Sequence, residues 1–239
     1  MSVSVFIASA AHADVDVAFS KSSACPGLFT RFFKKFLTPT EAPVEEPLSF
    51  EFAPHVGTPS TVTQIGYLEM RVEGASYHEL GRGGGGLVVR VVPPEGSPPF
   101  VLKNFFDLGR REIEERAMVQ LEKDSKHVKT KIRFVRQVPV GQKTARLDDV
   151  RGQTLKDLLD GVTLSSAERT HLLREWNELV RGVRSRVPKG RRKIDATYKG
   201  AEVLRYSFDK KDVSGDVFLK PDNVIVESGT GRMYIIDPY

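Results

Sequence analysis

The sequence predicts an α+β fold from three observations. Short β-branched runs surround a glycine-rich stretch within residues 80–103. Two amphipathic patterns typical of helices follow, at residues 110–123 and 165–187. Two apolar runs within residues 224–236 flank a Ser-Gly-Thr-Gly turn and indicate a β-hairpin. A chain of 239 residues is long enough for one domain, or one two-lobed domain, with a hydrophobic core.

The composition excludes several classes of protein. Hydrophobic and charged residues make up 40% and 28% of the chain, close to the globular average. The single cysteine, Cys25, excludes an internal disulfide and suits a reducing compartment. No apolar run is long enough to span a bilayer. The net charge is +5, and its basic clusters indicate a solvated surface, or else a site for nucleotide phosphates or an acidic partner; no nucleic-acid partner is expected.

The C-terminal stretch from Ser214 to Tyr239 holds the richest chemistry. Asn223 precedes the first strand of the predicted hairpin, in Lys-Pro-Asp-Asn, and Asp237 follows the second, in Ile-Ile-Asp. An amide and a carboxylate so placed can share one cation with phosphate oxygens, because Mg²⁺ takes oxygen ligands and keeps part of its shell for substrate. This order of motifs resembles the catalytic loop and metal-binding aspartate of protein kinases. The resemblance implies ATP and Mg²⁺ as cofactors, with Asn223 and Asp237 as metal ligands.

A phosphate-binding loop is predicted between Leu80 and Val88. It contains Gly81, Gly83, Gly84, Gly85 and Gly86, and three of these have the G-x-G-x-x-G spacing. Glycine lets the backbone approach phosphates closely. The motif alone is weak, but a dinucleotide-binding loop leads into a helix, whereas here residues 87–92 are β-branched and two prolines follow. A strand on each side of the loop is the arrangement found in kinases.

A lysine and a glutamate complete the resemblance upstream. Lys103 ends a short predicted strand, fifteen residues after Val88, where a kinase carries its phosphate-gripping lysine. The predicted helix at residues 110–123 presents the apolar residues Ile113, Ala117, Met118 and Leu121 on one face. Glu114 has the surroundings of the kinase glutamate that orients this lysine, and Glu112 and Glu115 are the alternatives.

The resemblance implies two lobes, a small β-rich N-lobe at residues 76–147 and a truncated helical C-lobe at residues 148–239. Two strands around a glycine turn are expected within residues 135–147, followed by a hinge that runs into a short helix. Asp149 and Val150 are the expected adenine-binding positions, through their backbone. Ser165 or Ser166 is expected to cap the long helix, with Glu168 in its first turn and Trp176 in the core.

One position departs from the kinase pattern. Kinases place the catalytic aspartate five residues before the metal-binding asparagine, and here Phe218 stands there. Asp216 is the candidate general base, because Ser-Gly-Asp resembles the His-Gly-Asp of aminoglycoside-phosphotransferase-like kinases with two residues inserted afterwards. A bulge at Val217 and Phe218 is expected to bring its carboxylate to the substrate hydroxyl. Asp222 is the alternative base.

The N-terminal residues suggest targeting rather than chemistry. Residues 1–47 are rich in Ser, Ala, Thr and Pro and are predicted to be a disordered secretion or targeting segment. Within them, the stretch from Leu28 to Leu37 has phenylalanines at helical spacing with basic residues between them. Such a stretch could contact a membrane weakly, dock on the folded domain or bind a chaperone. Residues 48–75 are predicted to extend the kinase domain at its N-terminal end.

The predicted function is that of an ATP- and Mg²⁺-dependent Ser/Thr protein kinase of minimal size. The sequence continues for two residues after Asp237, so no activation segment is expected, which resembles the type III effector kinases that bacteria inject into host cells. That resemblance implies secretion into the host cytoplasm and a host protein substrate. It also implies a ubiquitin-conjugating enzyme or a chaperone as a partner. The alternatives are a pseudokinase scaffold that sequesters a host partner, and a kinase-fold nucleotidyl transferase.

Overall fold

The computed structural model describes residues 48–61, 65–83, 85–161, 164–210 and 213–238. Its strands are β1 (Thr58–Pro59), β2 (Ser76–Gly83), β3 (Gly86–Val92), β4 (Phe100–Phe105), β5 (Arg133–Phe134), β6 (Val138–Pro139), β7 (Thr144–Asp148), β8 (Gly152–Thr154), β9 (Arg192–Tyr198), β10 (Ala201–Lys210), β11 (Val213–Leu219), β12 (Val224–Glu227) and β13 (Met233–Ile235). Its helices are α2 (Leu108–Ser125), α3 (Leu155–Asp160), α4 (Ser166–Arg186) and the short 3-10 helices η2 (Lys189–Arg191) and η3 (Pro221–Asn223). The mixed α and β character predicted from the sequence is confirmed.

A six-stranded antiparallel sheet, in the order β1-β2-β3-β4-β7-β6, holds most of the first half of the folded chain. Its centre is β3 and β4, whose β-branched and aromatic residues suit a strand that is buried on both faces. The predicted strand ending at Lys103 extends two residues further, to Phe105, because Asn104 still pairs with Thr144 of β7. Lys103 therefore lies inside a buried strand.

The two long helices begin where local signals place them. Asp107 caps α2 by accepting a hydrogen bond from the Gly109 N–H at 2.9 Å. Ser165 and Glu168 form a reciprocal capping box at the start of α4, as expected. Trp176 is fully buried on α4, and its indole N–H donates to the Glu202 carbonyl at 2.8 Å. The prediction that Trp176 belongs to the core is confirmed.

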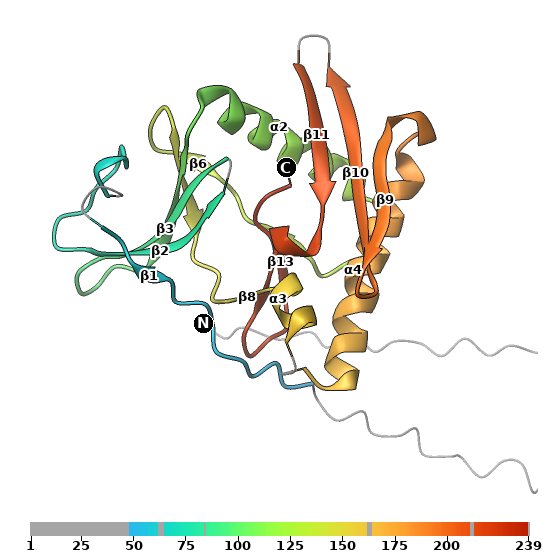
Figure 1. Ribbon diagram of the computed structural model, residues 1–239, viewed down its shortest axis with the longest axis horizontal. Coiled ribbons are helices and arrows are strands. Elements are labelled where there is room, and N and C mark those ends of the chain that lie inside the picture. Colours follow the sequence, from blue (N-terminus) through green and yellow to red (C-terminus); the bar gives the residue numbers. More distant parts are fainter. Residues whose placement is uncertain (1–47, 62–64, 84, 162–163, 211–212, 239) are drawn as a thin grey trace, which may run out of the picture. The chain divides into compact units, whose positions relative to one another are not determined.

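A three-stranded sheet, in the order β11-β10-β9, is the main departure from expectation. Residues 148–239 were predicted to be chiefly helical, but this sheet lies beside α4 (Figure 1). The reason is the alternation in β10, where Leu204, Tyr206 and Phe208 are buried and the residues between them face outward. The sequence carries this period of two, but the neighbouring charges concealed it.

The predicted C-terminal hairpin is confirmed. Strand β12 pairs with β13 in an antiparallel register that joins Val224 to Ile235. On its other side β12 pairs with β8, and β13 runs parallel to β5, which completes a four-stranded sheet. Gly152 of β8 is required by close packing, since a Cβ there would lie 1.9 Å from the Val226 carbonyl oxygen.

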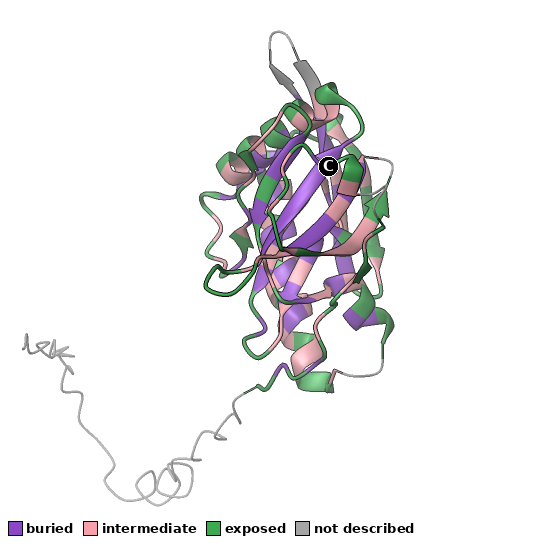
Figure 2. Cartoon of the chain, turned by 90° about the vertical axis from the view of Figure 1, so that its left-hand side faces the viewer, coloured by how far each residue is buried: buried purple, intermediate pink, exposed green. Residues whose placement is uncertain are grey.

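Residues 50–60, which we call the strap, run from the β12–β13 turn to β2. Phe50 and Phe52 are buried, in the core that also includes residues of α4 and β12. Figure 2 shows that buried residues gather on the strands at the centre of the fold. The Phe50 and Phe52 carbonyls accept hydrogen bonds from the β12–β13 turn, from the Gly229 N–H at 2.8 Å and the Ser228 hydroxyl at 2.7 Å respectively. At its other end the strap becomes β1 and pairs with β2. The predicted N-terminal extension is thus an integral part of the fold in its first half.

The substitution Phe50→Ala is expected to lower the free energy of unfolding by about 3 kcal/mol, because it removes a buried ring and leaves a cavity. Chemical denaturation of the full chain measures this. Glu51→Ala is the matched control, since Glu51 is exposed and its loss should change stability by less than about 0.5 kcal/mol. Equal effects of the two substitutions would contradict the placement of the strap.

The predicted targeting segment lies outside the described residues, together with its basic amphipathic stretch from Leu28 to Leu37 and with Gly84 of the glycine loop. The predictions for these residues therefore stay predictions. Among the helices of the described ranges, none is long and apolar enough to cross a membrane.

Candidate functional site

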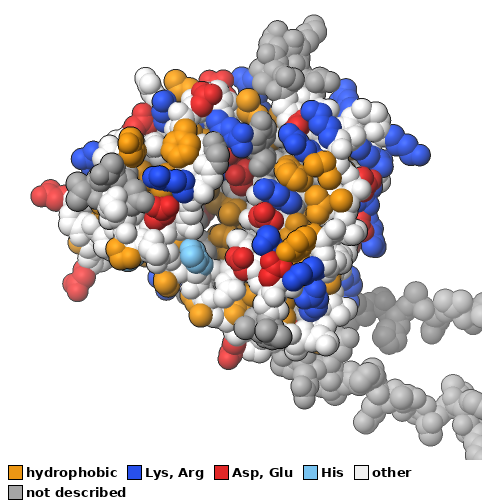
Figure 3. Space-filling model, viewed as in Figure 1, with side chains coloured by type: hydrophobic (Ala, Val, Ile, Leu, Met, Phe, Trp, Pro, Cys, Tyr) orange, Lys and Arg blue, Asp and Glu red, His pale blue; other side chains and the backbone are white. Residues whose placement is uncertain are grey.

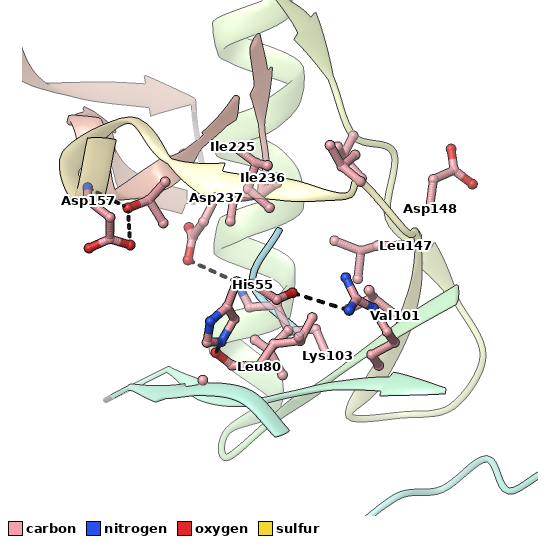
Figure 4. A pocket seen from close by; sticks show the side chains of 17 residues that line it. His55, Leu80, Val101, Lys103, Leu147, Asp148, Asp157, Ile225, Ile236 and Asp237 are labelled. Carbon is pink, nitrogen blue, oxygen red and sulfur yellow. Dashed lines mark hydrogen bonds and ion pairs between the residues drawn. The ribbon is translucent and has the colours of Figure 1, made fainter. Parts of the chain in front are cut away.

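A cavity of about 330 Å³ lies between the six-stranded sheet and the four-stranded sheet (Figure 4). This volume lies within the range of small-molecule sites. Its walls combine apolar side chains from both sheets with a few charged groups. The lining residues are His55, Leu80, Gly81, Val88, Arg90, Val101, Lys103, Val135, Leu147, Asp148, Val150, Gly152, Thr154, Asp157, Ile225, Ile236 and Asp237. Gly81, Val88, Lys103, Val150 and Asp237, which the sequence motifs predicted as site residues, therefore meet around one cavity.

Lys103 is the charged centre of this pocket. Its Nζ lies 2.5 Å from Oε1 of Glu114 and 2.9 Å from Oδ2 of Asp237. Glu114 comes from α2 and is 1% exposed, and it also accepts a hydrogen bond from the Gln137 side chain. The alternatives Glu112 and Glu115 are exposed. The structure thus brings Glu114, among the three candidates, to the lysine.

The three charges depend on one another. Burial raises the pKa of the Glu114 carboxyl above its ordinary value; the Lys103 charge opposes this shift, and the Asp237 charge adds to it. A group whose pKa is raised on folding stabilises the folded state less as pH rises through that value. Lys103 is therefore the counter-charge that favours the ionised form of Glu114. In exchange, the two carboxylates hold the ammonium group at a fixed place in the pocket.

The hairpin places Asn223 and Asp237 next to each other, as the sequence predicts. Asn223 ends η3, and its backbone carbonyl accepts from the Ile236 N–H at 3.0 Å. Its side-chain amide donates to the Phe218 carbonyl at 3.2 Å, which fixes the orientation of the amide group. No cluster of three or more His, Cys, Asp or Glu side chains suited to a metal occurs in the described part of the chain. A metal here would therefore need oxygen atoms from its substrate, as Mg²⁺ sites at phosphates do.

The two ends of the glycine loop line the cavity on the side of the six-stranded sheet. Gly83 pairs with Gly86 at the turn between β2 and β3, and Gly81 and Val88 line the cavity. A Cβ at Gly86 would lie 2.4 Å from the Asn104 carbonyl oxygen, so that position excludes any larger residue. The Gly85 carbonyl accepts from the Phe106 N–H at 3.3 Å, which joins the loop to the end of β4.

The predicted hinge also reaches the cavity. Asp148 and Val150 line it, at the end of β7 and just beyond. The side chain of Asp149 forms an ion pair instead: its Oδ1 lies 2.9 Å from the guanidinium of Arg90. Both side chains of this ion pair are nearly buried. Asp149 itself is not among the lining residues, although its neighbours Asp148 and Val150 are. The ion pair with Arg90 holds this segment against β3.

The candidate base Asp216 lies inside β11, which runs through Val217 and Phe218 in unbroken register with β10. The expected bulge is absent from this described strand, because each residue pairs with its partner on β10. Lys193 and Arg205 lie 2.9 Å and 2.7 Å from the two carboxylate oxygens of Asp216. The structure thus places Asp216 about 7 Å before Phe218 along the strand, between two cations.

Phe218, rather than Asp216, is the residue next to the hairpin. Its backbone N–H donates to the Pro238 carbonyl at 2.6 Å, and its carbonyl accepts from Asn223. The charged groups of Lys220 and Arg205 lie 5.1 Å and 5.6 Å from the centre of its ring. Asp222 is half exposed and lies 3.8 Å from Lys220. Acidic and basic side chains are interspersed over the face of the molecule shown in Figure 3.

Sequence patterns did not identify His55 or Arg90 as pocket residues. His55 belongs to the strap, and its ring Nε2 lies 3.1 Å from the Leu80 carbonyl oxygen. Arg90 donates to the His55 carbonyl at 3.2 Å. Neither residue stands in a motif, and the strap has no periodic pattern that would have signalled its position. The only available signal was the pair of phenylalanines in Ser-Phe-Glu-Phe, typical of a strand.

Comparisons with known proteins add little to this geometry. No protein-family model matches the chain, and no curated protein matches it at a significant level. Structures of the PknI kinase domain of Mycobacterium tuberculosis align with 70% of this chain. The unsubstituted domain has a TM-score of 0.37 and 16% identity, and a singly substituted form has 0.38 and 15%. The aligned part spans about three-fifths of each of those domains (60% and 59%), and a likeness at this level establishes neither the fold nor the activity of the chain.

Proposed function

We propose that the chain is a two-lobed, kinase-like phosphotransferase that binds ATP with Mg²⁺ between its six-stranded and four-stranded sheets. The observation that carries the proposal is the buried Lys103–Glu114 pair in contact with Asp237, at a cavity with apolar walls. Burying charged groups costs free energy of desolvation, so a functional ligand is a reason for the chain to keep them. A triphosphate is such a ligand, since it offers Lys103 the negative oxygens that a lysine binds well.

Each part of the nucleotide has a place in this proposal. The adenine lies between the apolar walls and contacts the backbone at Asp149 and Val150. The glycine loop covers the phosphates, Lys103 grips the α- and β-phosphates, and Glu114 orients Lys103. Asn223 and Asp237 hold Mg²⁺, which would neutralise the charge that develops on the phosphate oxygens.

The proposed reaction transfers the γ-phosphoryl group to a Ser or Thr hydroxyl of a protein. A bond forms between the hydroxyl oxygen and the γ-phosphorus, the bond to the β–γ bridging oxygen breaks, and ADP leaves. The hydroxyl proton passes to Asp216, whose carboxylate would first have to leave its ion pairs with Lys193 and Arg205; Asp222 is the alternative acceptor. Because phosphoryl transfer depends mostly on positioning and charge neutralisation, the base contributes only part of the rate.

Replacing Asp216 by asparagine is expected to lower turnover by about 10²–10⁴-fold, the usual contribution of a general base, with ATP affinity almost unchanged. Asp222→Asn is the matched control and should cost far less, because Asp222 lies in the short helix that presents Asn223 and its side chain is half exposed. Steady-state transfer from labelled ATP to a generic protein acceptor measures both. If Asp222→Asn is inactive and Asp216→Asn is fully active, the base is Asp222.

A second candidate function is a nucleotide-binding scaffold that transfers nothing. It is favoured by the ion pairs that hold Asp216 and by the aromatic ring at Phe218. Mass spectrometry of the protein after incubation with ATP separates the candidates. An added phosphate indicates a kinase, an added nucleotide indicates a nucleotidyl transferase, and an unchanged mass in a protein that binds ATP indicates the scaffold.

Delivery to a host cell is a further proposal, supported by the composition of residues 1–47 and by the resemblance to effector kinases. In this proposal a bacterium secretes the chain into the host cytoplasm, where it acts on a host protein or holds a ubiquitin-conjugating enzyme or chaperone. Fusing residues 1–47 to a reporter enzyme tests the first step. A reporter that is not exported by a type III system would remove this part of the proposal.

A further inference from the structure

The strap crosses from one wall of the pocket to the other. On the side of the four-stranded sheet, the His55 N–H donates to the Gly152 carbonyl at 2.9 Å, and the Gln153 side chain donates to the Ala53 carbonyl at 2.7 Å. On the other side, the Ser60 N–H donates to the Tyr77 carbonyl of β2 at 2.9 Å. The strap thus joins the two sheets that form the walls of the pocket, and it does not belong to the central strands of either sheet.

A turn at Gly57 lets the strap make this crossing. Gly57 has a φ of +76°, in the left-handed region that favours glycine. A Cβ at this position would also lie 2.5 Å from the Glu79 carbonyl oxygen, so the strap packs directly on the β2 backbone. Two residues earlier, the turn leaves His55 between Leu80 and Gly152.

The contact of the His55 ring with Leu80 determines which ring nitrogen donates. Because a carbonyl only accepts, the ring Nε2 at 3.1 Å from Leu80 must carry the proton and donate it. In the neutral ring, Nδ1 is then an acceptor. His55 is exposed and also lines the cavity, which places it where the cavity opens to solvent. Figure 4 shows its ring beside Leu80 in this pocket.

The backbone of His55 is fixed as well. Arg90 donates to its carbonyl at 3.2 Å and is itself held by the buried ion pair with Asp149. The N–H and the carbonyl of His55 are therefore both bonded, to opposite walls of the pocket. A pocket-lining side chain with this much support is positioned in advance, which limits the entropy lost on ligand binding.

We propose that the strap is part of the nucleotide site and that His55 contacts the nucleoside, as a hydrogen-bond acceptor for a hydroxyl or amine group at the mouth of the pocket. This inference rests on the proposed nucleotide binding and adds a residue from outside the two sheets. In this proposal Lys103 binds the phosphates, and His55 binds the nucleoside.

The test uses two probes that each contain one part of ATP: adenosine, and tripolyphosphate with Mg²⁺. In titration calorimetry on the full chain, His55→Ala is expected to weaken adenosine binding roughly 3- to 10-fold, as for one hydrogen bond, and to leave tripolyphosphate binding unchanged. Lys103→Ala should do the reverse. His55→Gln keeps a donor and an acceptor, and should recover part of the adenosine affinity.

His127→Ala is the matched control, because the ring Nε2 of His127 also lies 3.1 Å from a carbonyl oxygen, that of Gly182, away from the pocket lining. Adenosine binding that is equal in the His55 and His127 variants would overturn the inference. Equal weakening of both probes, with a lower melting temperature, would also overturn it, since His55 would then only support the fold. If the wild-type chain binds neither probe, the proposed function fails, and this inference fails with it.

Discussion

Lys103→Ala is expected to reduce phosphate transfer from labelled ATP to background and to weaken ATP binding by about 1.5–3 kcal/mol, the range for a hydrogen bond to a charged group. The physical reason is that one ammonium group joins Glu114 and Asp237 and would also bind the phosphates. Lys131→Ala is the matched control, because Lys131 is exposed. Unchanged transfer in the Lys103 variant would remove this lysine from the proposed site.

The same substitution has a second expected effect, on stability against pH. Without its counter-charge, the buried Glu114 should have a pKa raised further above its ordinary value than in the wild type. Since a raised carboxyl pKa favours the protonated folded state, the variant should lose stability, relative to the wild type, as pH rises through the pKa of Glu114. Urea denaturation at a series of pH values measures this loss. A constant difference between variant and wild type would contradict the coupling.

Asp237→Ala is expected to abolish the Mg²⁺-dependent part of the stabilisation by ATP, because it removes one of the two protein oxygens proposed for the metal. A thermal-shift measurement with ATP, with and without Mg²⁺, separates this effect from the loss of the contact between Asp237 and Lys103. Asp222→Asn is the matched control, since Asp222 lies beside Asn223 and its side chain is 49% exposed. An Asp237 variant that keeps the full Mg²⁺-dependent shift would show that the metal is held elsewhere.

Local patterns in the sequence predicted the parts of the site that local structure determines. The hairpin that brings Asn223 and Asp237 together follows from two β-branched runs and a glycine turn. The burial of Glu114 follows from its place on the apolar face of α2. These features depend on neighbours a few residues away, so their periodicity is visible without a structure.

The features that sequence reasoning missed depend on distant partners. Asp216 looks like a free carboxylate in the sequence, and only the register of β9, β10 and β11 brings Lys193 and Arg205 to it. The strap is a similar case, since it takes its structure from contacts with β2, β8 and the β12–β13 turn. Patterns of one residue type cannot reveal such pairings.

The strap contacts residues that the ribosome synthesises much later. The Ser228 hydroxyl that binds the Phe52 carbonyl is separated from it by 176 residues. At the usual elongation rate of about 5–20 residues per second, roughly 10–40 s pass on the ribosome between the synthesis of these two residues. During that interval Phe50 and Phe52 have no hairpin turn to pack on, and His55 has no Gly152 until more than half of the gap is filled. Phe50 and Phe52 therefore expose apolar surface, and the pocket cannot close, until residues 224–235 have been synthesised.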